Sequence, residues 1–260
     1  MKLAARIEGV GLHGPGLPGW SASRPILAGE VPYEPRATVI PSPEVLPATE
    51  RRRAGKCVKL SLAAGLEAAA AAGRSPRDLA AVFASSGGDG ENVHAICEML
   101  AGDDREISPT RFHNSVHNAP AGYWGIATGA AQPADSLAAF DASFAAGLLE
   151  TLARLAQRPG QPVLLIAYDA PYPEPLAATR PMTDAFSMAL LLSTAGDGPA
   201  ITASLVNEPA QSMPGELGAL RRGIPAARSL PLLALLASRR PGRVVLEYLD
   251  GLGLAVEVTA

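Results

Sequence analysis

Short, nearly continuous apolar runs alternate along the chain with stretches that place apolar side chains at helical spacing. The runs 79–85, 163–168 and 186–193 carry almost no polar side chains, which is typical of strands covered by helices on both faces. Residues 47–72 and 141–154 instead repeat apolar side chains every three to four positions. This alternation predicts an α/β fold in which helices cover a mixed sheet.

Turn and cap residues set the expected ends of several elements. We expect Thr49 to cap the helix over 47–72 at its start, and Gly73 to end it. The loop SSGGDG follows the strand at 79–85, and Asp89 in it fits the cap of a helix over 91–100. The loop matches neither GxGxxG nor GxxxxGK[ST], so a tight turn is favoured over a phosphate site.

The remaining segments complete the same architecture. An alternating strand is expected at 3–10, and further strands at 202–206, 243–248 and 254–259. Apolar spacing within 214–239 indicates helices. No long linker or low-complexity tract interrupts the chain, so we expect a single domain over 1–260.

Composition narrows the classes of function. The chain has 260 residues, 48% of them hydrophobic, and a formal net charge of −3, with an isoelectric point near 5.8. This charge favours no nucleic-acid partner. No apolar run is long enough for a signal peptide or a membrane span. Cys57 and Cys97 lack CxxC spacing, so we expect a soluble cytoplasmic protein with reduced thiols.

Two histidines have the spacing of metal ligands. His113 and His117 are four residues apart, so in a helix they share one face. A zinc site needs a third protein ligand, and there is no HExxH pattern. We therefore expect no metal and no cofactor.

The junction between an expected buried strand at 136–140 and the helix at 141–154 is the other candidate site. A helix start stabilises a developing anion, and Ser143 is the only hydroxyl there. A serine hydrolase would place its nucleophile in G-x-S-x-G, whereas this sequence reads D-A-S-F-A. All four histidines precede Ser143, which fits no usual order of such residues. A Ser143-dependent acyl hydrolase or transferase using His113 or His117 stays open as an alternative.

The stretch 108–150 resembles the core of the β-ketoacyl synthases. SPTRFHNSVHNAPAG follows that family's Ser-Pro, aromatic, Asn-x-x-x-Asn-Ala-x-Ala-Gly motif. VLLIAYDAP resembles its strand leading to an acidic residue, and MTDAFSMALLLSTA its later Phe-x-x-Ala-x-x-Leu segment. The resemblance implies the thiolase-like fold, limited to the amino-terminal half of the two-part ketosynthase.

The chain departs from the family at its reactive groups. Laying the sequence SFAA, residues 143–146, on the family's Ser-Leu-x-Ala puts Phe140 where the nucleophilic cysteine stands, within one or two residues. No cysteine follows Cys97, and no histidine follows His117, although the family uses two histidines in its second half. The resemblance therefore implies a chain with no catalytic residues that cannot condense acyl groups unaided.

Synthase-like proteins without the cysteine are chain-length factors, which pair with an active ketosynthase and shape the cavity for the growing chain. The resemblance implies such a subunit of an aryl-polyene or related fatty acid or polyketide pathway, with an active β-ketoacyl synthase and an acyl carrier protein as partners. A self-associating acyl-binding homodimer stays open as an alternative. The residues implied in the substrate tunnel or degenerate active site are Phe140, Ser143 and Phe144. Those implied in the dimer interface, together with the strand at 136–140, are Asn118, Ala121, Gly122, Trp124 and Gly125.

Overall fold

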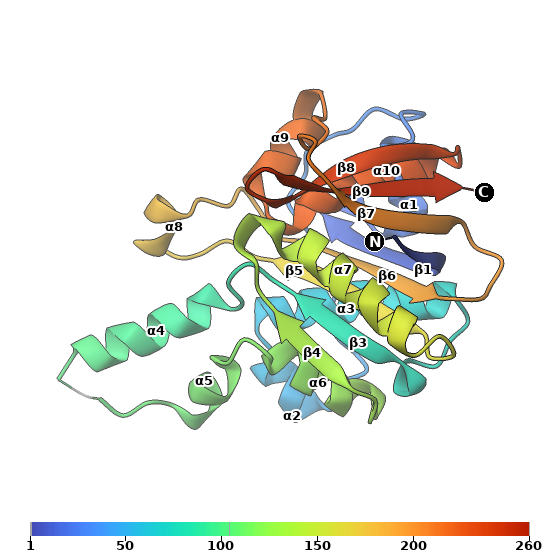
Figure 1. Ribbon diagram of the computed structural model, residues 1–260. Coiled ribbons are helices and arrows are strands. Elements are labelled where there is room, and N and C mark those ends of the chain that lie inside the picture. Colours follow the sequence, from blue (N-terminus) through green and yellow to red (C-terminus); the bar gives the residue numbers. More distant parts are fainter. Residues whose placement is uncertain (1, 104, 260) are drawn as a thin grey trace.

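The computed structural model describes residues 2–103 and 105–259, and its strands form one mixed nine-stranded sheet (Figure 1). The strand order is β4-β3-β5-β6-β1-β7-β9-β8, with the short β2 paired to β1. β3 runs parallel to β4 and β5, and the other neighbouring pairs are antiparallel. The strands are β1 (Leu3–Gly14), β2 (Leu17–Pro18), β3 (Ala80–Ala84), β4 (Ala134–Leu137), β5 (Val163–Asp169), β6 (Phe186–Ser193), β7 (Ala200–Val206), β8 (Gly242–Leu249) and β9 (Leu252–Thr259). The predicted helix-covered mixed sheet is confirmed.

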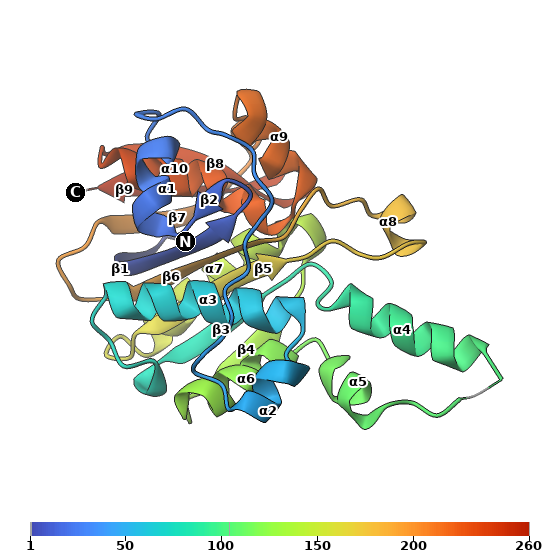
Figure 2. The same ribbon diagram turned by 180° about the vertical axis from the view of Figure 1, so that it is seen from behind.

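Helices cover both faces of the central strands, which explains their unbroken apolar runs. α3 (Lys56–Ala71) packs on β1, β5 and β6, and α7 (Ser143–Gln157) packs on β3 and β5 from the other side (Figures 1 and 2). Neighbouring residues of one strand therefore enter different cores: Leu165 packs on the α7 side and Ile166 on the α3 side. Every residue of β3, β5 and β6 is buried.

Small residues allow α3 to lie unusually close to β1. A Cβ atom on Gly9 would lie 2.1 Å from the carbonyl oxygen of Ala68, and one on Gly11 would lie 2.0 Å from that of Ala64. No side chain fits at such distances, so these two glycines and the alanines of α3 set the spacing between helix and sheet.

The helix expected over 47–72 is divided in two. α2 (Ala48–Arg53) ends at Ala54, whose ψ of 119° is extended, and α3 begins at Lys56. The expected Thr49 cap is wrong, because α2 begins after Pro47 with no side-chain cap. Gly73 does follow the end of α3 in the left-handed region, at φ 62°, as predicted.

The carboxyl-terminal third carries the helices that were expected within 214–239. They lie over the β8 end of the sheet, and α1 packs beside α10. None of the helices in the described residues is long and apolar enough to cross a bilayer. The helices of the carboxyl-terminal third are α9 (Gly215–Gly223), the 3-10 helix η3 (Ala226–Ser229) and α10 (Leu230–Ser238), whereas α1 (Trp20–Leu27) comes from the amino-terminal part of the chain.

Two helices project from the sheet as an arm (Figure 1). They are α4 (Gly90–Ala101) and α5 (Pro109–Asn114), and Asn92 is the only buried residue of α4. Asp89 caps α4 as predicted, because its carboxylate accepts a hydrogen bond from the backbone N–H of Asn92 at 3.1 Å. The arm makes little contact with either core.

Candidate functional site

The expected strand at 136–140 ends earlier and lies elsewhere than predicted. β4 covers Ala134–Leu137 at the edge of the sheet, where β3 is its one pairing partner among the residues that the structure describes. Its residues are exposed or half-buried, so the prediction of a buried strand is wrong. The apolar residues of the segment predicted a buried strand. They do not show whether another strand pairs with its outer edge.

A sharp turn joins β4 to α7, and Phe140 stands at its apex. Phe140 begins the 3-10 turn η2 (Phe140–Ala142) with φ 51°, in the left-handed region that a bulky residue rarely adopts. Its side chain is 63% exposed. A strained strand-to-helix turn that presents one side chain is the geometry of a nucleophile elbow. The presented group here is a phenyl ring.

Ion pairs fix this turn from the carboxyl-terminal side. The guanidinium carbon of Arg180 lies 3.5 Å from the centre of the Phe140 ring. Arg180 also pairs with Asp141 at 2.5 Å, and Arg228 reaches the other oxygen of Asp141 at 2.7 Å. Arg228 continues to Glu247 on β8. The ring is therefore held against a cation and anchored to the far end of the sheet.

Ser143 and Phe144 lie below the turn and do not reach the surface. The Ser143 hydroxyl donates to the carbonyl of Phe140 at 2.7 Å and accepts from the N–H of Ala139 at 3.0 Å. It is buried and closes the turn as a hydrogen-bonded strut. Phe144 is 1% exposed and packs in the α7-side core. Of the three expected tunnel residues, Phe140 alone is exposed.

The histidines are engaged elsewhere. His117 Nε2 lies 3.2 Å from the carbonyl oxygen of Ser85, and the His113 ring stands edge-on to Tyr123 at 6.0 Å. Within the described part of the chain, backbone groups are the hydrogen-bond partners of the Ser143 hydroxyl, and no histidine is. The same residues hold no group of three or more His, Cys, Asp or Glu placed to bind a metal ion.

Asp169, at the end of β5, is a buried acid. Its Oδ1 accepts hydrogen bonds from the Ser85 hydroxyl at 3.1 Å and from the Ser86 hydroxyl and N–H at 2.8 Å each. Its Oδ2 accepts from the N–H of Ala226 at 2.8 Å. Burial raises the pKa of Asp169 to about 6, and the bonds from Ser86 and its neighbours oppose that rise. The carboxylate ties the loop after β3 to η3; the strand-to-acid motif was its only sequence signal.

The expected interface residues divide between two faces of α6 (Ala119–Thr128). Trp124 is buried, edge-on to Phe83 with ring centres 6.4 Å apart. Asn118 and Gly122 are exposed, and Ala121 and Gly125 are half-buried. A Cβ atom on Gly122 would meet no atom within 4 Å. The outer face of the helix is therefore flat and open.

Apolar side chains are exposed on the elements around this helix face. Phe112 and Val116, in and after α5, are 64% and 50% exposed, and Ile126 of α6 is 48% exposed. Phe140 is a further exposed apolar side chain, in the turn that follows β4. Exposed apolar patches of this kind mark interaction sites.

The chain belongs to the family of the β-ketoacyl synthase N-terminal domain, whose sequence model matches residues 27–242. No match was found among curated protein sequences.

Solved structures share the fold at low sequence identity. A chain of the ketosynthase ApeO in complex with its chain length factor ApeC from Xenorhabdus doucetiae has a TM-score of 0.73 at 22% identity, covering 98% of this chain and 99% of that one. A chain of the ishigamide ketosynthase/chain length factor gives 0.72 at 14%, with the same coverage. A chain of AntDE:AntF, a type II PKS acyl-carrier protein in complex with its ketosynthase bound to the hexaketide, gives 0.74 at 11% and covers both chains fully. The architecture is thus the thiolase-like ketosynthase fold.

Proposed function

We propose that this chain is a chain-length-factor-type subunit that has no condensing activity of its own and pairs with an active β-ketoacyl-ACP synthase. The observation that carries the proposal is the elbow between β4 and α7, where Phe140 is the presented side chain. Acyl transfer in this family needs a thiolate at that position, and a phenyl ring can neither attack a thioester nor hold an acyl group.

The proposed partner face consists of the free edge of β4, the outer face of α6 and the arm of α4 and α5. An unpaired edge strand offers backbone donors and acceptors to a second chain. Obligate interfaces are large and apolar, and Phe112, Val116 and Ile126 supply exposed apolar groups here. Asn118, Ala121, Gly122 and Gly125 line the flat helix face, while Trp124 supports that face from within.

Phe140 is the residue proposed to act on the product. Its ring is exposed in the turn that follows β4, the edge strand of the proposed partner face, and a tunnel shared by the two subunits would open there. We infer that it limits the length of the chain that the partner builds, with Ser143 and Phe144 supporting it from below.

The pathway class is fatty acid or polyketide biosynthesis of the aryl-polyene type, and an acyl carrier protein is the second partner. The structures that share the fold include complexes with a chain length factor and with an acyl-carrier protein, which supports this assignment.

Co-expression with an active β-ketoacyl synthase from the same organism, followed by size-exclusion chromatography with mass detection, tests the pairing. A 1:1 complex is expected. Gly122→Arg, on the open face of α6, should abolish it because the side chain would stand in the interface. Gly160→Arg is the matched control, since Gly160 is also exposed with nothing within 4 Å of a Cβ atom but lies in the turn before β5.

Two results would contradict the proposal. One is a homodimer that ignores the synthase, which would favour the self-associating acyl-binding scaffold. The other is a complex that survives Gly122→Arg unchanged, which would place the interface elsewhere.

A further inference from the structure

A cavity lies at the opposite end of the strands from the elbow. It has a volume of about 460 Å³ and is bounded by β1, α1, the end of α10 and the end of β9. The register shows its position: Leu12 of β1 is level with Ala84 at the carboxyl end of β3, whereas Ile7 is level with Ala80 at the amino end. The cavity contains Ile7 and Val10 and not Leu12, so it lies away from Phe140.

The cavity wall is mostly apolar. Trp20 of α1 lies at one side, half-buried, and Leu235 and Leu236 of α10 form another part of the wall. Val10 and Val258 line it from the sheet. A volume of this size is within the range of small-molecule sites, which combine such walls with a few charged groups.

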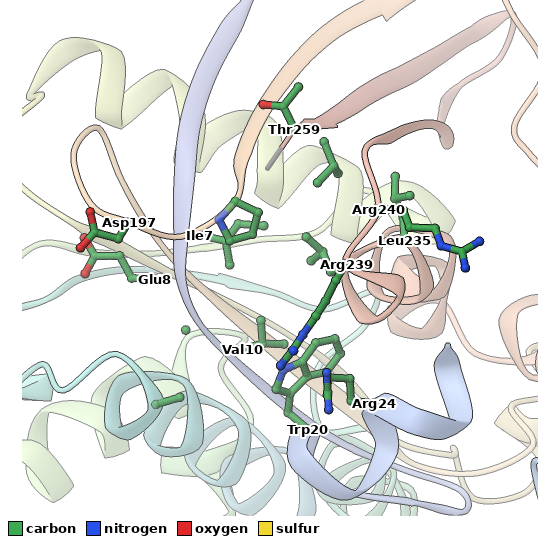
Figure 3. Close-up of a pocket in the computed structure, with 15 residues that line it drawn as sticks. Ile7, Glu8, Val10, Trp20, Arg24, Asp197, Leu235, Arg239, Arg240 and Thr259 are labelled. Carbon is green, nitrogen blue, oxygen red and sulfur yellow. The ribbon is translucent and has the colours of Figure 1, made fainter. Parts of the chain in front are cut away.

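Three arginines supply the charge, and none has an acidic partner among the described residues. Figure 3 shows Arg239 extending from the end of α10 toward the indole of Trp20, with Arg24 beside it and Arg240 directed elsewhere. Arg24 is half-buried and Arg239 is exposed, and both line the cavity, so an anion bound there would have two guanidinium groups available to pair with.

The acids of the cavity do not cancel this charge. Glu8 already forms two hydrogen bonds with Arg74, at 2.8 and 3.0 Å, outside the arginine group. Asp197 lies on the far side of the cavity in Figure 3. The end near Trp20 is therefore the cationic one.

The backbone at Arg239 is a separate observation. Arg239 ends α10 with φ 55°, and its N–H bonds to the carbonyl of Leu236 at 3.2 Å. Glycine is the residue this left-handed position favours. An arginine here holds its side chain over the cavity at a conformational cost that glycine would avoid.

From these features we propose that the cavity binds an organic anion with a short apolar tail. The carboxylate or phosphate head pairs with Arg24 and Arg239, because guanidinium groups match the geometry of both. The tail lies against Trp20, Leu235 and Leu236. This site is independent of the elbow and of the proposed pairing with a synthase.

Tryptophan fluorescence of the full chain tests the proposal. The protein has two tryptophans, and Trp124 is buried in the α3-side core, so a change should come from Trp20. Octanoate and octyl phosphate, below their micelle concentrations, are the two anionic probes, and whichever binds tighter identifies the head group. Octanol and acetate test the tail and the head alone. We expect one anionic probe to bind at least about tenfold tighter than both of these.

The variants assign the binding to the arginines. Arg24→Gln with Arg239→Gln should raise the Kd of the better anion at least about tenfold, while the exposed Arg52→Gln on α2 should leave it unchanged. Circular dichroism and thermal melting establish that each variant is folded, and calorimetry with Trp20→Phe checks binding without the fluorophore. Equal binding of octanol, an unchanged Kd in a folded double variant, or no binding of either anion up to about 1 mM would overturn the proposal.

Discussion

Phe140 combines the two properties that matter most in this chain, a strained backbone and an exposed aromatic ring. The strain is maintained because Arg180 covers the ring and two arginines hold Asp141 beside it. Strained positions cluster at functional sites, where the surrounding structure enforces them. At this turn the strained backbone holds the bulky phenyl ring of Phe140 exposed at the surface.

Replacing the ring tests its role in the product. In a reconstituted pair, Phe140→Ala should shift the products toward longer chains, because the tunnel loses a phenyl group, and Phe140→Trp should shorten them. Mass spectrometry of the released chains reads the shift. Val39→Ala, which also truncates an exposed apolar side chain but lies between α1 and α2, outside the proposed partner face, is the control. Unchanged product lengths in both Phe140 variants, with the pair intact, would remove Phe140 from length control.

Asp169 predicts a pH dependence of stability. Its folded pKa of about 6 lies above the ordinary value of 3.8, so the folded state binds the proton more tightly than the unfolded state. This contribution to stability is fully present below about pH 4 and is lost as pH rises through 6. With about 1.4 kcal/mol per pKa unit, the loss amounts to about 3 kcal/mol.

Urea unfolding of the wild type and Asp169→Asn between pH 4 and 7 isolates this contribution. The variant should lack the decline that belongs to Asp169, because its amide does not titrate. At pH 7 the variant should have a free energy of unfolding about 1–3 kcal/mol lower than that of the wild type, since an amide cannot accept all the hydrogen bonds of the carboxylate. Parallel pH profiles for the two proteins would contradict the assigned pKa.

At the scale of elements, α3 and β1 depend on direct contact between two backbones. Gly11→Ala should lower the free energy of unfolding by about 2–3 kcal/mol, because its Cβ would meet the carbonyl oxygen of Ala64. Chemical denaturation measures the change. Gly122→Ala, on the open face of α6, should be neutral or slightly stabilising in the lone chain. Equal effects of the two would show that α3 can move away from the sheet.

The central elements could be predicted from the sequence because burial on both faces left a simple signal. The run at 186–193 became β6 with the same ends, and 163–168 became β5 with one residue more. The edge strand β4 could not be placed, because the apolar pattern of the segment does not show whether neighbouring elements cover it. The break before α3 occurs at Ala54 and Gly55, and nothing in the apolar spacing marked it.

The site was predictable only in part, for a related reason. Phe140 could be located by its place in a motif. The partners of Asp169 could not, because Ser86 and Ala226 are 83 and 57 residues away in sequence and meet only in the folded sheet. The network of Arg180, Asp141 and Arg228 joins a loop, a turn and a 3-10 helix in the same way.

At the scale of the whole molecule, the chain presents two separate surfaces. One is the apolar face around β4, α6 and the arm, next to the elbow. The other is the arginine-lined cavity at the amino end of the β3 register. The first is the proposed interface with the synthase, and the second is the proposed binding site for an organic anion.

We propose that this chain shapes the product while its partner performs the chemistry. Incubating the 1:1 complex with an acyl-carrier-protein thioester and measuring the intact mass of both chains tests it in one spectrum. We predict an acyl adduct on the synthase alone, with this chain at its unmodified mass. An acyl adduct on this chain that is lost in Ser143→Ala would contradict the account and establish the Ser143-dependent acyltransferase instead.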